Sequence, residues 1–141
     1  MSRHRGPGGI SLPAAALAVA WSVASFPFLL PHVVEDFGWG IADRAGLTAD
    51  VGAALLGLGL AVQILGLILS GQGKRGGLVV VAVAGAVWTL GALWEHGMAL
   101  LLFGFGFRGR PLSAIWALGL LLTQALACAF AVAALLRPWR S

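Results

Sequence analysis

The chain has 141 residues, of which 60% are hydrophobic and 10% are charged. A soluble domain of this size needs roughly a quarter of its residues charged, so the composition excludes a water-soluble fold. The net charge of +4 is typical of a membrane protein with basic cytoplasmic edges and does not indicate nucleic-acid binding. The single cysteine, Cys128, excludes membrane thiol oxidoreductases that use paired cysteines.

Four apolar segments follow one another along the chain, each of about the length that crosses a hydrocarbon core of about 30 Å. Helices satisfy every backbone polar group inside a bilayer. We therefore expect an all-α membrane protein, a four-transmembrane-helix bundle that forms a single integral membrane domain over residues 1–141. The predicted helices cover residues 12–36, 51–70, 78–102 and 111–136.

The first predicted helix begins with a pattern that resembles a signal peptide. Basic residues precede an apolar run that reaches the small residues Ser22-Val23-Ala24. Apolar sequence continues beyond them to Leu30, so we expect a retained first helix. Pro27 and Pro31 are expected to kink its outer half.

The second helix follows a loop in which residues 41–45 are expected to form a short helix. Thr48 and Asp50 are candidate N-caps of the second helix. Small residues along that helix predict a close-packing face, and they are Ala53, Gly57 and Ala61.

The third helix is predicted to be an antiparallel neighbour of the second, because only the short glycine-rich turn 71–77 separates them. Residues 97–107 either extend this helix or lie along the outer interface. A stripe of mainly small residues is expected to face the bundle interior, and it comprises Gly85, Thr89, Ala92 and His96. Polar side chains near the bilayer centre predict interhelical hydrogen bonds, and they are Gln63, Thr89 and Gln124.

The distribution of basic residues predicts the orientation. With the amino terminus inside, six basic residues face the cytoplasm, namely Arg3, Arg5, Lys74, Arg75, Arg137 and Arg140. Three face outward, namely Arg44, Arg108 and Arg110. This asymmetry follows the positive-inside rule, so both termini are expected to be cytoplasmic. Trp39, Trp94 and Trp116 would then lie at the outer interface and Trp139 at the inner one. We expect the location to be the inner membrane of a prokaryote.

A faint internal repeat accompanies this topology. Residues 37–40 and 103–106 share a Phe-Gly-aromatic-Gly pattern, and an arginine follows each segment within a few residues. Two parallel helical hairpins related by an axis along the membrane normal would produce this pattern. The alternative interpretation is coincidence in a chain rich in glycine and phenylalanine.

Two clusters of ionisable residues are candidates for a functional site. His32, Glu35 and Asp36 share one side of a continuing first helix, because they are three and four residues apart. Glu95 and His96 form the second cluster near the end of the third helix. At 1.5 Å per residue, His32 lies about 29 Å along the first helix and Glu95 about 26 Å along the third. Both helices run outward, so the two clusters are expected to meet just beneath the outer face.

Several chemistries use such residues. Histidine and carboxylate side chains suit a transition-metal ion, with His32, Glu35, Glu95 and His96 as candidate ligands. Two histidines from two helices can also ligate a haem. A carboxylate–histidine pair can relay protons or act as acid and base on a lipophilic substrate. In the plainest interpretation these residues are solvated helix ends.

The function that these patterns favour is binding of a small ligand or metal ion in a polar pocket just beneath the outer membrane face. The expected ligand-binding residues are His32, Glu35, Asp36, Glu95 and His96. One alternative is a membrane enzyme that uses the same cluster on a lipophilic substrate. Another is a non-catalytic accessory subunit of a larger membrane complex. The expected partners are the lipid bilayer and either further copies of the chain or a larger membrane complex, and no nucleic acid is expected.

Overall fold

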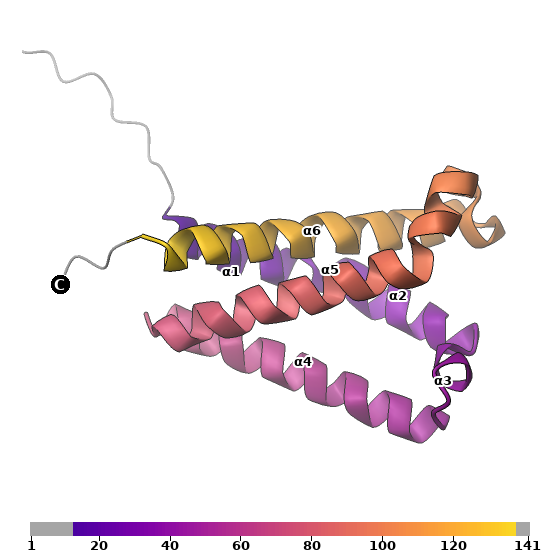
Figure 1. The fold of residues 1–141 in the computed structure, drawn as a ribbon, viewed down its shortest axis with the longest axis horizontal. Coiled ribbons are helices and arrows are strands. Elements are labelled where there is room, and N and C mark those ends of the chain that lie inside the picture. The colour runs from indigo at the N-terminus through magenta and orange to yellow at the C-terminus, as the bar shows by residue number, and fades with distance from the viewer. Residues whose placement is uncertain (1–12, 138–141) are drawn as a thin grey trace, which may run out of the picture.

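A computed structural model describes residues 13–137, and these residues form helices joined by short turns (Figure 1). The elements are α1 (Ala14–Ala24), α2 (Phe26–Gly38), α3 (Ile41–Arg44), α4 (Ala49–Gly71), α5 (Arg75–Phe103), the 3₁₀ helix η1 (Gly104–Gly109) and α6 (Pro111–Leu135). Four helical segments within the described residues are long and apolar enough to cross a membrane. The predicted fold class, an all-α membrane protein with four spanning helices, is therefore confirmed. Arg3, Arg5, Trp139 and Arg140 lie outside the described residues.

The four spans of the sequence analysis correspond to α1 with α2, then α4, α5 and α6. α6 packs against α5 and against both halves of the first span, whereas α4 packs mainly against α5. In Figure 1, α4 and α5 diverge from the turn that joins them, and α3 closes the wider end. Of the segment 97–107, residues 97–103 continue α5 as in the first interpretation, whereas residues 104–107 belong to η1.

The first span is interrupted at Ser25, between α1 and α2. Pro27 stands at the start of α2, and its ring nitrogen carries no hydrogen to donate to the preceding turn. The Ser25 hydroxyl donates to the Ser22 carbonyl, one turn earlier, at 2.7 Å. The expected irregularity is thus found at Pro27. α2 continues through Pro31 to Gly38, so His32 lies within the helix, and the kink expected at Pro31 stays a prediction.

Polar side chains join the helices in the middle of the bundle. Gln63 of α4 donates to the Ser22 hydroxyl of α1 at 3.0 Å and accepts from the Trp88 indole of α5 at 2.8 Å. Gln124 of α6 donates to the Ser25 hydroxyl at 2.8 Å. The predicted interhelical bonds of both glutamines are confirmed. The prediction for Thr89 is wrong, because its hydroxyl bonds to a carbonyl one turn earlier in α5, as threonine often does within helices.

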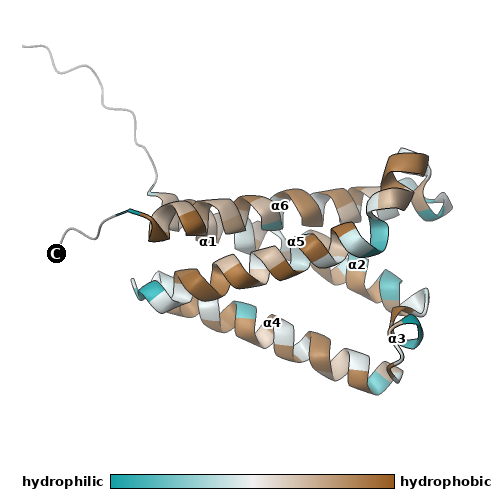
Figure 2. Cartoon of the chain, viewed as in Figure 1, coloured by the Kyte–Doolittle hydropathy of each residue, from teal (hydrophilic) through white to brown (hydrophobic). Residues whose placement is uncertain are grey.

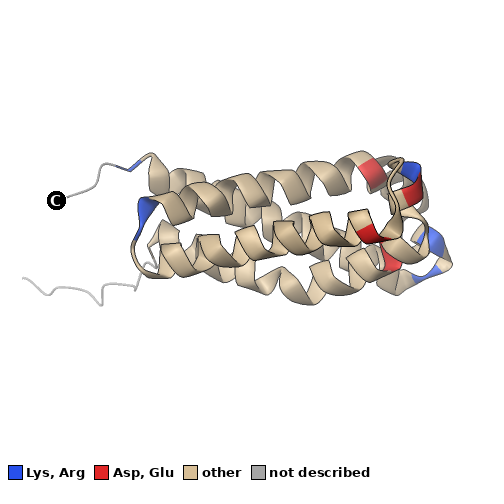
Figure 3. Ribbon diagram, turned by 90° about the horizontal axis from the view of Figure 1, so that it is seen from below, with Lys and Arg blue, Asp and Glu red and all other residues tan. Residues whose placement is uncertain are grey.

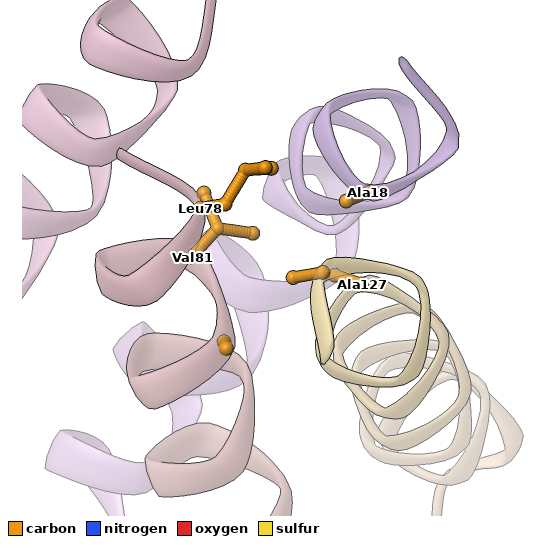
Figure 4. Close-up of a cluster of buried hydrophobic side chains, with 6 residues drawn as sticks. Ala18, Leu78, Val81 and Ala127 are labelled. Atoms are coloured by element: carbon orange, nitrogen blue, oxygen red, sulfur yellow. The ribbon is translucent and has the colours of Figure 1, made fainter. Parts of the chain in front are cut away.

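The core near the α4–α5 turn is built from small and branched side chains of α1, α5 and α6. Ala18, Leu78, Val81 and Ala127 meet there (Figure 4). Glycine allows close contact between α5 and α6: a Cβ at Gly85 would lie 2.8 Å from the Gln124 carbonyl oxygen. In lipid there is no hydrophobic driving force between helices, so their association depends on close packing, which small residues allow.

The predicted close-packing face of α4 is wrong. Ala53, Gly57 and Ala61 are exposed in the chain, and α4 turns Gln63 and Gly66 inward instead. A Cβ at Gly66 would lie 2.6 Å from a methyl carbon of Val80 on α5. Because α5 is the main neighbour of α4, only one narrow face of α4 can be covered.

The described charged residues lie at the two ends of the bundle, and the acidic ones lie at one end only (Figure 3). All acidic residues lie at the end that carries α3, which we call the acidic end (Figure 3). Lys74, Arg75 and Arg137 lie at the opposite end, where the Arg75 guanidinium donates to the Leu135 carbonyl at 2.6 Å. Between the two ends, most residues of the helices are hydrophobic (Figure 2). The membrane orientation of these ends stays a prediction.

The loop of the acidic end contains the short helix expected from the sequence, α3. Thr48 caps α4, since its hydroxyl accepts from the Val51 amide at 3.3 Å. Of the two candidate caps, Thr48 is therefore the one used. α3 packs against α2 and α4, the two helices that it connects.

Candidate functional site

Three buried side chains meet at the acidic end. His32 and Asp36 lie one turn apart on α2, and His96 approaches them from α5. The Oδ2 atom of Asp36 lies 3.2 Å from Nε2 of His96 and 3.5 Å from Nε2 of His32. One potential ligating atom from each residue lies within 4.8 Å of the other two. The residues are only 2%, 6% and 2% exposed for His32, Asp36 and His96, so the cluster is enclosed by protein.

The two imidazoles contact each other directly. The ring centroids of His32 and His96 are 4.9 Å apart, with an angle of 82° between the ring planes. Phe107 of η1 packs edge-on against His96 at 5.4 Å and is itself buried. A haem with two axial imidazoles lies between them, so this edge contact disfavours a haem held by both histidines.

Arg108 holds the carboxylate of the cluster from the other side. Its Nη2 atom lies 2.6 Å from Oδ1 of Asp36, and its Nη1 atom lies 3.3 Å from Oε2 of Glu35. The guanidinium also lies over the rings of Phe107 and Trp39. Arg108 thus contacts Oδ1 of Asp36, while Oδ2 is the oxygen that contacts the two histidines.

Glu35 and Glu95 flank the cluster but are engaged elsewhere. Glu35 pairs with Arg108 and accepts from the Ser113 hydroxyl of α6 at 2.5 Å. Glu95 pairs with Arg44 of α3, which also donates to the Trp39 carbonyl. The structure thus brings His32, Asp36 and His96 together, and it places both glutamates in ion pairs beside them.

A cavity of about 450 Å³ lies against the cluster. This volume is within the range of about 300–1,000 Å³ that is usual for small-molecule sites. Its walls come from α2, α3, α5 and α6, and its lining residues include His32, Asp36, Arg44, Trp88, Glu95 and His96. The lining also includes apolar residues such as Val33, Val87 and Leu120.

One nitrogen of the His32 imidazole has no hydrogen-bond partner among the described residues. This atom, Nδ1, is buried. Leaving such an atom without a partner in a low-dielectric interior costs free energy. Two imidazoles and one carboxylate form a ligand set that zinc and non-haem ferrous iron accept. The arrangement is therefore chemically suited to a metal ion held by one nitrogen from each histidine and one oxygen of Asp36.

Sequence reasoning missed the arginines of the site. The sequence associates Arg44 and Arg108 with the orientation and with the internal repeat, yet each pairs with an acidic residue of a candidate cluster. Ser113, at the start of α6, carried no recognisable pattern. The five acidic residues near this end, against three arginines, were the available indication that these arginines would form ion pairs. Comparisons with family models, with curated proteins and with solved structures found no match for this chain.

Proposed function

We propose that the protein is an integral membrane protein that binds a transition-metal ion through His32, Asp36 and His96. The observation that carries this proposal is the approach of three potential ligating atoms to within 4.8 Å of one another in a buried cluster. Ionisable groups inside a membrane bundle are costly and usually functional. Coordination of an ion offsets that cost.

The surroundings of the cluster support the same function. Carboxylate ligands of metal ions are usually held by further hydrogen bonds, and histidine ligands by packing that orients the ring. Arg108 holds Asp36 through an ion pair, and Phe107 packs against the His96 ring. Three protein ligands leave a coordination position open, as in zinc sites that bind water or a substrate. His32, Asp36 and His96 all line the adjoining cavity, which has room for such a molecule.

The same geometry supports one second candidate, a membrane enzyme. A cavity beside an open metal position admits a substrate, and the apolar walls favour a lipophilic one. An accessory subunit without its own site would instead be expected to show solvated helix ends. The burial of all three residues favours the binding protein and the enzyme over that alternative.

Zinc binding tests the proposal. The chain carries a third histidine, His4, so the test protein has His4 replaced by alanine and a purification tag without histidine. Equilibrium dialysis against zinc in detergent micelles, followed by elemental analysis, should find one ion per chain. His32→Ala, Asp36→Asn and His96→Ala should each weaken binding by more than about 100-fold, beyond the loss usual for outer-shell residues.

The matched control is Asp43→Asn, which removes an exposed carboxylate of the same end and should leave zinc affinity unchanged. A protein that binds no zinc, cobalt or ferrous iron would contradict the proposal. So would zinc binding that survives His32→Ala and His96→Ala.

A further inference from the structure

A second hollow adjoins the cavity of the candidate site. It is a groove of about 600 Å³ between α4 and α5, and its lining residues are Leu55, Leu56, Leu58, Gly59, Val62, Val79, Val80, Val83, Ala84, Val87 and Trp88. Val87 and Trp88 line the polar cavity as well. The two hollows are therefore neighbours that share one wall.

The groove is apolar along its whole length. Its side chains remain open on the outer side, with Leu58 62% exposed and Val83 58% exposed. It lies between α4 and α5, which diverge from the turn that joins them (Figure 1). In a bilayer such a surface contacts hydrocarbon, so the groove suits a hydrocarbon chain and the cavity suits a polar group.

Trp88 stands between the two hollows in a fixed position. Its indole N–H donates to Gln63 Oε1 at 2.8 Å, and Gln63 is in turn held by Ser22. On the groove side, a Cβ at Gly59 would lie 3.8 Å from the Trp88 ring. Gly59 thus keeps open the part of the groove beside the ring, and any longer side chain at this position would enter that space.

The charged residues of the cavity favour one kind of ligand head group. The two carboxylates that line it are each paired with an arginine, Asp36 with Arg108 and Glu95 with Arg44. A charged head group would have to compete with these pairs, whereas an uncharged oxygen can accept from or donate to an imidazole. The site therefore matches a compact, neutral oxygen group such as a hydroxyl.

We propose that the protein binds an amphipathic molecule with one hydrocarbon chain and an uncharged hydroxyl head. The head lies in the cavity beside His32, Asp36 and His96, and the chain passes Trp88 into the groove between α4 and α5. This proposal deepens the proposed function, on which it rests for the polar end, because the hydroxyl oxygen reaches the open position of the metal ion. The ligand enters from the bilayer and not from water.

Photolabelling tests the proposal. The probe is 1-hexadecanol with a diazirine near its tail, added to the protein in phosphatidylcholine vesicles, and the labelled peptides are mapped by mass spectrometry. Labels should concentrate in residues 55–62 of α4 and 79–88 of α5. Gly59→Phe should reduce this labelling about tenfold, equivalent to ~1.4 kcal/mol of binding free energy. The control Gly57→Phe makes the same change on the same helix, at an exposed position with nothing within 4 Å of its Cβ, and should leave labelling unchanged.

Competition on the unaltered protein gives an independent result. Unlabelled 1-hexadecanol should displace the probe, whereas hexadecane, which has no head, and palmitate, whose head is charged, should displace it far less. Equal competition by hexadecane would show that only lipid contact is measured and would overturn the proposal. Equal loss of labelling in Gly57→Phe and Gly59→Phe would also overturn it.

Zinc affinity separates this proposal from the proposed function. Gly59→Phe should bind zinc as the unaltered protein does, since residue 59 touches none of the three candidate ligands. If the protein binds zinc but Gly59→Phe is labelled as strongly as the unaltered protein, the lipid ligand is contradicted and the metal site is not. Labelling at the groove in a protein that binds no metal would contradict the metal site and the binding of the head to a metal ion, but it would leave the hydrocarbon chain in the groove.

Discussion

Arg108 combines a strained backbone with the most connected side chain of the site. Its φ of 55° is the one left-handed value of a non-glycine residue among residues 13–137, a conformation that costs roughly 1–2 kcal/mol. Its guanidinium pairs with Asp36 and Glu35. Strain of this kind persists where surrounding contacts hold it, and it is frequent at functional sites. We infer that Arg108 is a positioning residue that turns Asp36 toward the two histidines.

Replacing Arg108 should therefore weaken metal binding without removing a ligand. Arg108→Gln should lower zinc affinity about 10- to 100-fold, as is usual for the loss of an outer-shell partner. Arg108→Lys should lower zinc affinity less than Arg108→Gln, because lysine keeps the positive charge. Some loss is still expected, because lysine cannot bridge both carboxylates. Zinc dialysis measures both, with Arg110→Gln as the exposed control. Equal affinity of the Gln variant and the unaltered protein would remove Arg108 from the site.

Glu95, unlike Arg108, forms an ion pair that is partly exposed to solvent. Its side chain is 29% exposed and pairs with Arg44, which is 48% exposed. Exposed pairs are worth roughly 0.2–1 kcal/mol, so Glu95→Gln should change zinc affinity by less than about fivefold, far less than Asp36→Asn. The comparison is made in the same dialysis series. A larger loss for Glu95→Gln than for Asp36→Asn would restore Glu95 as the carboxylate ligand expected from the sequence.

At the scale of helices, close contact between α5 and α6 depends on glycine. A Cβ at Gly85 would meet the backbone of α6 at 2.8 Å, whereas a Cβ at Gly91 on the same helix would have nothing within 4 Å. Overpacking costs typically 1–3 kcal/mol. Gly85→Ala should lower the free energy of unfolding by about this amount, and Gly91→Ala should not lower it. Titration with a denaturing detergent checks this, and indistinguishable midpoints for the two variants would refute the packing account.

Much of the helical layout could be predicted from the sequence, because apolar length and turn residues are local properties. The Thr48 cap, the short helix before it and the bonds of Gln63 and Gln124 all follow from such local rules. The site could be predicted only in part. Helical spacing puts both Glu35 and Asp36 on the side of His32, and it does not choose between them.

The choice between the two acids depends on contacts between distant elements. η1 folds back over the end of the bundle and brings Phe107 and Arg108 to His96 and Asp36. Ser113, from the first turn of α6, binds Glu35 and holds it away from the histidines. Neither contact has a periodic pattern in the sequence. The close-packing face of α4 was mispredicted for a similar reason, since spacing alone does not say which neighbours a helix has.

The whole molecule has one acidic end and one end where the described charges are basic (Figure 3). The positive-inside rule predicts that the basic end is cytoplasmic, and that the metal site then lies near the outer face. The hairpin repeat likewise stays a prediction.

Cysteine labelling in intact cells checks the orientation, in a Cys128→Ala background that removes the native thiol. Asp43→Cys should react with a membrane-impermeant maleimide from outside. Lys74→Cys should react only after the cells are permeabilised. The reverse pattern would invert the molecule and place the site at the cytoplasmic face.

The central claim is that His32, Asp36 and His96 bind one ion together. X-ray absorption spectroscopy of the zinc-loaded His4→Ala protein tests this most directly, because the spectrum reports the ligands of the metal itself. The claim predicts two imidazole nitrogens and light-atom oxygen ligands at about 2.0–2.2 Å, and one imidazole fewer in His96→Ala. A spectrum with sulfur at about 2.3 Å, or one without imidazole scattering, would contradict it.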